Sequence, residues 1–280
     1  MRRDDDPPWA DAPLDYLTQL GQGPDDGFDP GAAALAFAAL ERPRAALGRY
    51  LAHLDALAGE TAAFAPADIQ ARAAALAEVV HMSHGYTGDA QTYDDMQNAS
   101  LIRVIDRKKG LPVALGILHM SIAHRLGWRM IGLGFPGHFL LCLEDEGQRL
   151  PLDPFDNAAV LTAPDMRRIL KAVQGEHAEL TAACYQPVSD RDVLLRLQNN
   201  IKLRRLRGGD IAGALKVAEA MAAFAPAIGD LHREIAMMHM RLENIGDAIR
   251  NFERYLALEP NESLRHKAAA LLQELRNRLN

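Results

Sequence analysis

The stretch from Gly110 to Phe155 changes its hydrophobic spacing partway along, and this change constrains the fold more than any other feature of the sequence. Apolar residues first recur every three or four positions, as in a helix, until Gly127 provides a residue suited to a helix C-cap. The apolar runs that follow have the length and flanking turns of strands. A helix is therefore expected at 113–126, and strands are expected at 130–135, 139–143 and 150–152. A helix followed by antiparallel strands predicts an α+β fold.

Upstream of this stretch, three segments with helical spacing of apolar residues predict a group of N-terminal helices. Their high alanine content is typical of closely packed helices and carries no chemical signal. The segments cover 31–43, 43–60 and 65–89, with Pro43, Gly59 and Pro66 as punctuation. We expect these helices and the α+β core to form one domain over 31–188.

The net charge of −6 is concentrated at the N-terminus. Residues 1–30 contain two arginines and eight aspartates, so the rest of the chain is formally neutral. This head is rich in Pro, Gly and Asp, and it is expected to be a flexible acidic arm. The balanced remainder lacks the basic field of a nucleic-acid-binding protein, so no nucleic-acid partner is expected.

Cysteine usage and hydropathy indicate the compartment. Cys142 and Cys184 are too few for a disulfide framework and fit a reducing environment. No apolar run approaches the ~20 residues that cross a bilayer. No apolar segment follows the N-terminal arginines, as it would in a signal peptide. The sequence therefore predicts a cytoplasmic protein with no membrane partner.

His138 and Asp153 form the candidate catalytic pair. His138 follows Pro-Gly between two expected strands, and Asp153 lies fifteen residues later, across the expected hairpin. A Cys-His-Asp site also needs a thiol at the start of the preceding helix, where the imidazole deprotonates it. That position offers only Pro112, Val113 and Ala114. In the alternative interpretation, His138 is a sheet-edge histidine bonded to Asp153 for structure alone.

The motifs around this pair resemble those of the bacterial SirB-type proteins of the transglutaminase-like superfamily, which have tetratricopeptide repeats behind that domain. The matching motifs are Gly88-Asp89, Asn98, Gly110-Leu111-Pro112-Val113, Arg125-Leu126-Gly127, Phe135 to Phe139 and Asp153-Pro154-Phe155. The resemblance implies a papain-like α+β core, with His138 and Asp153 at the histidine and aspartate of the superfamily triad. It places the superfamily cysteine at Pro112, where this family also has proline.

The same resemblance bears on the other candidate site residues. Asn98, Pro112 and Gly137 belong to the matching motifs and are predicted to take part in binding. The hydroxyl residues that the family tends to have after Asn98 and after Pro112 are Ala99 and Ala114 here. A serine or threonine nucleophile is therefore not expected at either position.

Neither cysteine is a good replacement for the missing nucleophile. On one strand, His138 and Cys142 would point the same way but lie about 13 Å apart, at ~3.3 Å per residue. Nucleophile and base must approach to roughly 3 Å. Cys142 is expected to be a small buried hydrophobe. Cys184 lies in the connection to the C-terminal region, and only tertiary structure could bring it to His138.

The sequence predicts no metal site and no cofactor. His81 and His84 lie three residues apart near a helix end, but no third ligand with suitable spacing follows them. We expect them to cap the helix or to meet solvent. The acidic and amide side chains at 89–98 lack the alternate spacing of an EF-hand and are interpreted as loop and N-cap residues.

The C-terminal third contains an internal repeat with the 34-residue period of tetratricopeptides. Ala214 and Ala248 are 34 residues apart, and so are Pro226 and Pro260. The repeat resembles tetratricopeptides over roughly 195–260, and the segment that follows has the pattern of a polar capping helix. We therefore expect an all-α tetratricopeptide-like domain over 189–280.

Three functions are compatible with these patterns. The first is a pseudoenzyme whose papain-like cleft binds a peptide or partner protein without covalent chemistry. The second is a hydrolase or acyltransferase in which His138, held by Asp153, activates water, a contribution of roughly 10²–10⁴-fold. The third is an assembly adaptor that works through the repeat surface. The absence of a nucleophile favours the first.

Overall fold

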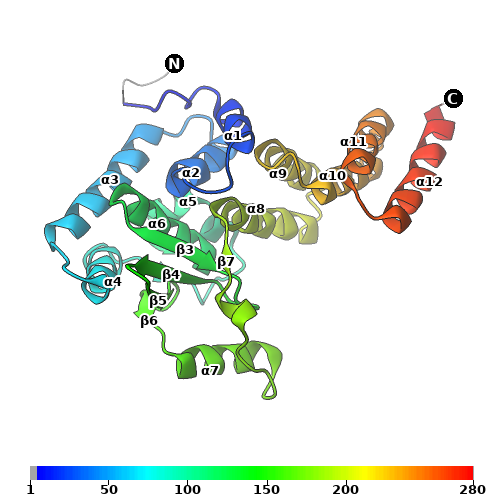
Figure 1. Cartoon of the computed structure of the whole chain (residues 1–280). Helices are drawn as coiled ribbons and strands as arrows, with labels where there is room; N and C mark the ends of the chain where they lie inside the picture. Colours follow the sequence, from blue (N-terminus) through cyan, green and yellow to red (C-terminus); the bar gives the residue numbers. More distant parts are fainter. Residues whose placement is uncertain (1–4, 280) are drawn as a thin grey trace. The chain divides into compact units, whose positions relative to one another are not determined.

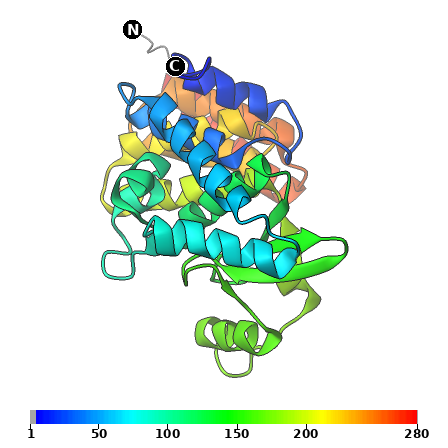
Figure 2. The same cartoon turned by 90° about the vertical axis from the view of Figure 1, so that its left-hand side faces the viewer.

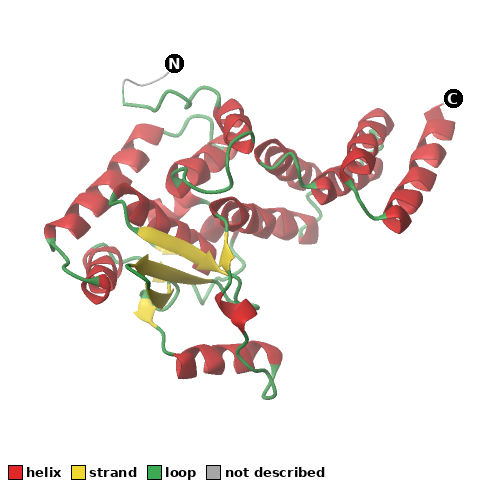
Figure 3. Cartoon of the chain, viewed as in Figure 1, coloured by secondary structure: helices red, strands yellow, loops and turns green. Residues whose placement is uncertain are grey.

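A computed structural model describes residues 5–279 and divides them into two compact units. The first unit contains the described residues up to Pro13 together with Asp25–Leu197. The second contains Leu14–Pro24 and the described residues from Gln198 onward. All strands of the described chain belong to the first unit, whereas the second is helical (Figure 3). No helix in the described residues is long and apolar enough to cross a membrane.

The first unit is built around α6 (Pro112–Arg125), a helix that is buried along almost its whole length. Apolar residues surround it on every side, which is typical of a central core helix. α2 (Pro30–Glu41) and α3 (Leu47–Ala63) pack against it. At Gly31 of α2, an added Cβ atom would lie 2.2 Å from the Ser121 hydroxyl oxygen of α6. Small side chains therefore allow the close helix packing that the alanine content indicates.

The five-stranded sheet of the first unit consists of β3 (Arg129–Leu133), β4 (Leu140–Asp145), β5 (Gln148–Asp153), β6 (Ala159–Val160) and β7 (Pro187–Val188). It is antiparallel, with the order β6-β5-β4-β3-β7 (Figure 1). The register places Cys142 between Ile131 and Pro151. The predicted succession of a helix and antiparallel strands is therefore confirmed.

Helices on either side of the sheet complete this core. α6 packs against β3 and β4, and α4 (Ile69–Ala77) packs against β4 and β5 (Figure 2). α7 (Ala163–Gln174) is amphipathic and buries Met166 and Leu170 in an apolar cluster with Cys142. The chain then returns to β7 through the short helix η3 (Ala182–Tyr185).

Between α4 and α6 the chain forms several short elements, so the helix expected over 65–89 is too long. α4 passes into a π-helical turn, η1 (Glu78–Ser83), in which His84 N donates to Val79 O at 3.0 Å. Gly85 follows with a φ of +69°, a conformation that ends helices. The remaining elements are β1 (Thr87–Gly88), η2 (Met96–Ala99), α5 (Leu101–Arg107) and β2 (Lys109–Gly110), and β1 pairs with β2 in parallel.

Helices alone form the second unit. α9 (Ile211–Phe224) and α11 (Ile245–Leu258) start 34 residues apart and end 34 residues apart. Ala214 and Ala248 lie at equivalent positions in these helices, and both are fully buried. The other helices are α1 (Pro13–Gly21), α8 (Asp190–Arg207), which begins in the first unit, α10 (Gly229–Arg241) and α12 (Glu262–Leu279). The predicted helical C-terminal region is therefore confirmed.

The acidic head differs from the flexible arm expected over 1–30, because its described part is folded. Leu17 of α1 is fully buried. Asp29 caps α2 by accepting from a backbone N–H of its first turn at 2.9 Å. Asp25 accepts from Arg191 Nε at 2.5 Å. The composition of this segment did not indicate this order, because composition does not show that its aspartates bind backbone N–H and guanidinium groups. The first four residues lie outside the described chain.

Candidate functional site

The candidate pair lies where β5 ends and shortly before β4 begins. His138 Nε2 and Asp153 Oδ2 are 2.8 Å apart. The second carboxylate oxygen of Asp153 accepts from Phe155 N at 2.9 Å. Asp153 is 6% exposed, whereas the side chain of His138 is 24% exposed. A carboxylate fixed through both oxygens therefore holds one nitrogen of an imidazole that remains accessible.

The bond to Asp153 determines which nitrogen of His138 is open. A carboxylate accepts hydrogen bonds, so Nε2 carries the proton and Nδ1 presents its lone pair when the ring is neutral. Among the described residues, Nδ1 of His138 has no hydrogen-bond partner. This nitrogen can take a proton from a thiol, a hydroxyl or water, or accept a hydrogen bond from a ligand N–H.

Gly137 shapes the turn that presents His138. Its φ is +68°, in the left-handed region that favours glycine. An added Cβ atom would lie 2.2 Å from Cγ1 of Val173 in α7. The sequence predicts Gly137 as a binding residue, and the structure places it in a turn packed against α7.

The start of α6 presents no nucleophile to this imidazole. Pro112 is the first residue of the helix, a position where its fixed φ and missing N–H are tolerated. Pro112, Val113 and Ala114 are all buried. None of them carries a hydroxyl or a thiol. The first turn of α6 is therefore apolar and buried at the position where the resemblance places the superfamily cysteine.

Close packing brings α6 against the segment that carries the imidazole. Phe139, the neighbour of His138 in sequence, lies on Gly116 of α6. A Cβ atom at Gly116 would come within 2.3 Å of the phenyl ring. Any side chain at this position would displace the residue next to His138, so Gly116 sets the distance between helix and strand.

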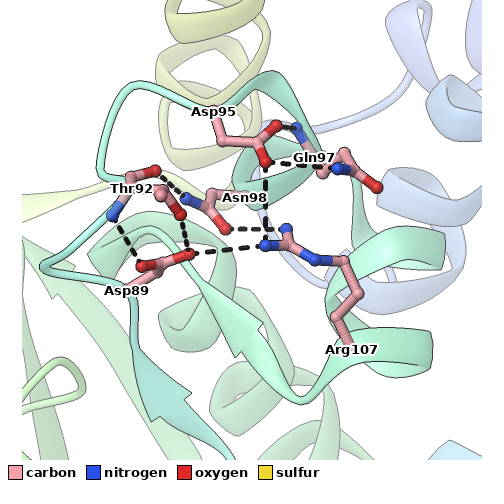
Figure 4. A network of polar contacts seen from close by, with 6 residues as sticks. All are labelled: Asp89, Thr92, Asp95, Gln97, Asn98 and Arg107. Carbon is pink, nitrogen blue, oxygen red and sulfur yellow. Dashed lines mark hydrogen bonds and ion pairs between the residues drawn. The ribbon is translucent and has the colours of Figure 1, made fainter.

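Asn98 belongs to a polar network that fixes the loop before α5 (Figure 4). Its side-chain amide donates to Thr92 O at 2.7 Å, and its side-chain oxygen accepts from Arg107 at 2.9 Å. The Arg107 guanidinium also lies 3.4 Å from Asp89 and 3.7 Å from Asp95. Asn98 is 0% exposed, so a residue predicted to take part in binding is engaged within the protein.

Asp89 is the buried carboxylate of this network. It accepts from Thr92 N at 2.9 Å and from the Thr92 hydroxyl at 2.6 Å. These hydrogen bonds lower the pKa of Asp89 to about 2. Asp95 caps η2 by accepting from Gln97 N at 2.9 Å. The interpretation of these acids as loop and cap residues is therefore confirmed for Asp89 and Asp95.

Both cysteines belong to one apolar cluster. Cys142 is 1% exposed, in agreement with its expected role as a buried hydrophobe, and burial raises the pKa of its thiol. Cys184 is 3% exposed, and its sulfur lies 3.9 Å from the Thr181 hydroxyl oxygen. Neither thiol is hydrogen-bonded to His138 in the part of the chain that the structure describes.

The first unit also contains a buried pair of histidines that the sequence analysis did not predict. His81 Nε2 lies 3.2 Å from His119 Nε2, and their ring centroids are 5.1 Å apart. The Nδ1 atoms face Tyr86 O at 2.7 Å and Leu115 O at 2.9 Å. His81 is 5% exposed and His119 is 0% exposed. The expectation that His81 caps a helix or meets solvent is therefore wrong.

This second pair is closed to ligands. Burial lowers the pKa of both imidazoles, and that of His119 to about 3. Each of the four ring nitrogens already faces a neighbour. No group of three or more His, Cys, Asp or Glu side chains in the described chain could hold a metal ion. The one available sequence signal was His119 in the middle of the apolar segment 113–126, which also contains His124 near its end.

Comparisons with known proteins agree with this architecture. A family model described as the transglutaminase-like superfamily matches residues 48–199. A UPF0162 protein of Pseudomonas aeruginosa is 30% identical over 252 residues, which cover 89% of this chain and 91% of that protein. SirB1 of Salmonella typhimurium is 26% identical over 160 residues, which cover 57% and 59%.

A UPF0162 protein of Xylella fastidiosa is 28% identical over 180 residues, and the match spans 63% of this chain and 64% of that protein. No solved structure matches the chain. The family model covers more than half of the sequence, and its range contains both the His138–Asp153 pair and the Asn98 network. The chain therefore belongs to the transglutaminase-like superfamily, in the group represented by the bacterial UPF0162 and SirB1 proteins.

Proposed function

We propose that this protein is a pseudoenzyme of the superfamily, which binds a peptide or a partner protein without covalent chemistry. One observation carries the proposal: an oriented, accessible imidazole belongs to a fold whose helix start has no nucleophile. Covalent acyl transfer requires an attacking thiol or hydroxyl. Pro112, Val113 and Ala114 provide none. The His138–Asp153 pair therefore has a lone pair to offer and no group of its own to activate.

The surroundings of the pair suit a peptide. Nδ1 of His138 can accept a hydrogen bond from a peptide N–H, while Asp153 maintains the required tautomer. Phe155, whose N–H binds Asp153, packs edge-on against Tyr93 with ring centroids 6.1 Å apart. Tyr93 is 46% exposed, so its ring offers apolar contact area beside a polar group. Aromatic side chains with a polar end are favoured at protein interfaces.

We further infer that the C-terminal helices are tetratricopeptide-like repeats over 189–280, following a transglutaminase-like domain over 31–188. The 34-residue offset between α9 and α11 supports this inference. Within the second unit, a hollow of about 720 Å³ has polar side chains on four of its helices, α1, α9, α10 and α11. Its lining includes Glu219, His232, His239, Arg250, Asn251 and Arg254. This surface is the one through which an assembly adaptor would act.

A hydrolytic function is the second candidate, and the open Nδ1 of His138 is the observation that favours it. A neutral imidazole oriented by a carboxylate can deprotonate a water molecule as a general base. Such a site needs no protein nucleophile, but it gains only roughly 10²–10⁴-fold from this effect. A substrate with an activated ester or thioester would suit so modest a catalyst.

The proposal is tested by following the His138 imidazole by NMR in the wild type and in Asp153→Asn, with and without a pooled peptide library. We expect peptides to shift the His138 signals in the wild type, and Asp153→Asn to change the tautomer and weaken that response. His177, an exposed histidine, provides the matched internal control. In parallel, hydrolysis of p-nitrophenyl acetate should be equal in the wild type and in His138→Ala.

Each contrary result selects another function. Loss of ester hydrolysis in His138→Ala would overturn the pseudoenzyme and support the general-base hydrolase. If no peptide shifts the NMR signals of His138, binding at this pair is refuted. In that case, peptide-induced shifts at Arg250 and Arg254 would assign binding to the second unit.

A further inference from the structure

Three titratable side chains from distant parts of the first unit meet outside the His138–Asp153 pair. They are His53 from α3, Tyr86 from the segment before β1, and Lys108 from the end of α5. Tyr86 Oη lies 2.8 Å from His53 Nε2 and 3.0 Å from Lys108 Nζ. Lys108 Nζ lies 3.1 Å from His53 Nε2. Each group is therefore within hydrogen-bond distance of the other two.

Lys108 adopts an unusual backbone conformation in this cluster. It follows α5 with φ +60° and ψ +25°, a left-handed conformation in which glycine is the favoured residue. Its N–H donates to Val104 O at 2.8 Å, and its carbonyl accepts from Thr87 N at 2.9 Å. Left-handed residues other than glycine are concentrated at functional sites, where their surroundings hold them in place. Here the backbone bonds hold the lysine, and its amine meets Tyr86.

The charged groups around Lys108 leave its amine without a counterion. In the described residues, no carboxylate lies within ion-pair distance of Nζ. Asp106 is bound to Arg49 at 2.8 Å and accepts from Tyr50 at 3.1 Å. Glu60 is bound to His84 at 2.7 Å. The two acids near the cluster are therefore both engaged with other groups.

The protonation states follow from this setting. Burial lowers the pKa of Lys108, and Asp106 opposes this effect only in part. Burial, together with the charges of Lys108 and His84, lowers the pKa of His53 to about 4. Burial raises the pKa of Tyr86, so its phenol keeps its proton. In the neutral form, which burial favours, the amine can accept from the Tyr86 hydroxyl and donate to His53 Nε2, so these two of the three contacts are hydrogen bonds.

We propose that Lys108 is a nucleophilic amine that condenses with the carbonyl group of a small aldehyde or ketone to form a Schiff base. Lysine amines are suited to this chemistry when burial lowers their pKa and so raises the fraction of neutral amine. Lys108 is only partly buried, unlike Tyr86, which is 1% exposed. Tyr86 and His53 are positioned to move the protons that the condensation requires.

The steps balance without any further reagent. The Nζ lone pair attacks the carbonyl carbon, Tyr86 gives its phenolic proton to the carbonyl oxygen, and His53 Nε2 takes one proton from nitrogen. The carbinolamine then loses its hydroxyl group as water, with the proton returned from His53. The remaining N–H proton passes to the Tyr86 phenolate. One amine and one carbonyl therefore give one imine and one water, and both helper residues regain their starting states.

The proposal is tested by reductive trapping on the full chain at neutral pH. Glycolaldehyde and sodium cyanoborohydride are added at low conversion, and mass spectrometry of peptides gives the labelling rate of each lysine. We expect Lys108 to react several-fold faster than Lys109, because a lowered pKa raises the fraction of neutral amine at a given pH. Lys109 is the exposed neighbour in sequence and serves as the matched control. Lys108→Arg should remove the fast label alone.

Two further variants test whether the fast labelling of Lys108 depends on its neighbours in the cluster or only on the exposure of its amine. Tyr86→Phe and His53→Gln should each slow labelling at Lys108 and leave labelling at Lys109 unchanged. Should either variant fail to fold, the pH–rate profile of the wild type tests the lowered pKa of Lys108 directly, because its labelling should persist to lower pH than that of an ordinary lysine.

Other outcomes would overturn the proposal. If Lys108 is labelled no faster than Lys109, its side chain is an unreactive ammonium held near the Tyr86 ring, whose centroid is 4.2 Å from Nζ. Fast labelling of Lys108 that is unchanged in Tyr86→Phe and His53→Gln would show that neither residue transfers protons in the reaction. A fast reaction with an aryl ester, but none with glycolaldehyde, would refute the carbonyl as the substrate class.

Discussion

The Asn98 network and the His138–Asp153 pair are both polar clusters from the same set of sequence motifs, yet they use their hydrogen-bonding groups differently. In the network, the side chain of Asn98 bonds to Thr92 and Arg107 and is 0% exposed. In the pair, one nitrogen of a partly exposed imidazole is left open. The motif residues therefore divide into those that fix a loop and those that can meet a ligand.

The closed cluster should be the more costly to disturb, and Arg107→Met tests this with the largest expected effect. The change leaves the carboxylate of Asp89, which is 4% exposed, without its guanidinium neighbour. Breaking a buried ion pair from one side costs about 3–5 kcal/mol. We expect the free energy of unfolding to fall by about 3 kcal/mol, because the bonds from Thr92 remain.

Urea unfolding measures this difference, and Arg103→Met on the same helix is the matched control. Arg103 has no ion pair among the described residues, so its loss should cost less than about 0.5 kcal/mol. Equal losses in the two variants would show that the network does not stabilise the loop.

The buried histidine pair extends the comparison to a second closed cluster. His119→Leu keeps most of the buried volume but removes the hydrogen bond from His119 Nδ1 to Leu115 O and the stacking on the His81 ring. An intramolecular hydrogen bond contributes about 0.5–1.5 kcal/mol. We expect a loss of unfolding free energy in that range by chemical denaturation. A neutral or stabilising change would mean that the two imidazoles repel each other in the folded protein.

The same pair should make the fold sensitive to acid. Burial lowers the folded-state pKa of His119 to about 3, against an ordinary value of 6.5. Between these values the unfolded chain binds a proton that the folded chain does not. Stability is therefore fully present above pH 6.5 and decreases as the pH falls, by up to about 1.4 kcal/mol per pH unit. His81 adds to this decrease, since burial lowers its pKa as well.

Unfolding curves measured at several pH values check this dependence. His119→Leu should show a shallower decrease than the wild type between pH 6.5 and pH 5. Parallel curves for the two proteins would assign the acid sensitivity to other groups, such as His53, whose pKa is lowered to about 4.

The open pair should tolerate substitution better than either closed cluster. His138→Gln exchanges the imidazole N–H for an amide N–H that can still donate to the buried Asp153 carboxylate, so that carboxylate keeps a donor. We expect a loss of unfolding free energy below about 1 kcal/mol, with a normal circular dichroism spectrum. A loss as large as that of Arg107→Met would contradict the division into closed and open clusters and favour a purely structural role for His138.

The smallest expected effect concerns Lys108 and has the opposite sign. Glycine adopts its left-handed conformation without strain, whereas other residues pay about 1–2 kcal/mol there. The greater freedom of glycine in the unfolded chain offsets part of this gain. We expect Lys108→Gly to raise the free energy of unfolding by about 0.5 kcal/mol. A clear loss would mean that the amine stabilises the fold through Tyr86 and His53.

The fold of the first unit was predictable because its signals are local. The spacing of apolar residues after Gly110 indicates the central helix and the three main strands, and Pro-Gly before His138 indicates the turn. The division of roles among the site residues was not predictable. Asn98 and His138 both lie in site motifs, and only the contacts of Asn98 with Thr92 and Arg107 show that its polar groups are engaged.

The remaining clusters escaped prediction because they join positions far apart in the chain. His81 meets His119 over a separation of 38 residues, and Lys108 meets His53 over 55. No spacing rule connects such positions. The folded acidic head was missed for a related reason, because Asp25 finds its partner Arg191 across 166 residues.

The course of α8 limits how this chain can be cut or recombined. The helix continues across the boundary between the units, which falls after Leu197. The first half of α8 packs against the sheet region. Val193 lies against Gly132 of β3, and the Arg196 guanidinium lies 5.4 Å from the Phe139 ring centroid. A fragment ending at the predicted boundary, residue 188, would therefore expose part of its own core. The two units share one helix, so a fragment that keeps the first unit intact must include α8 at least to Leu197.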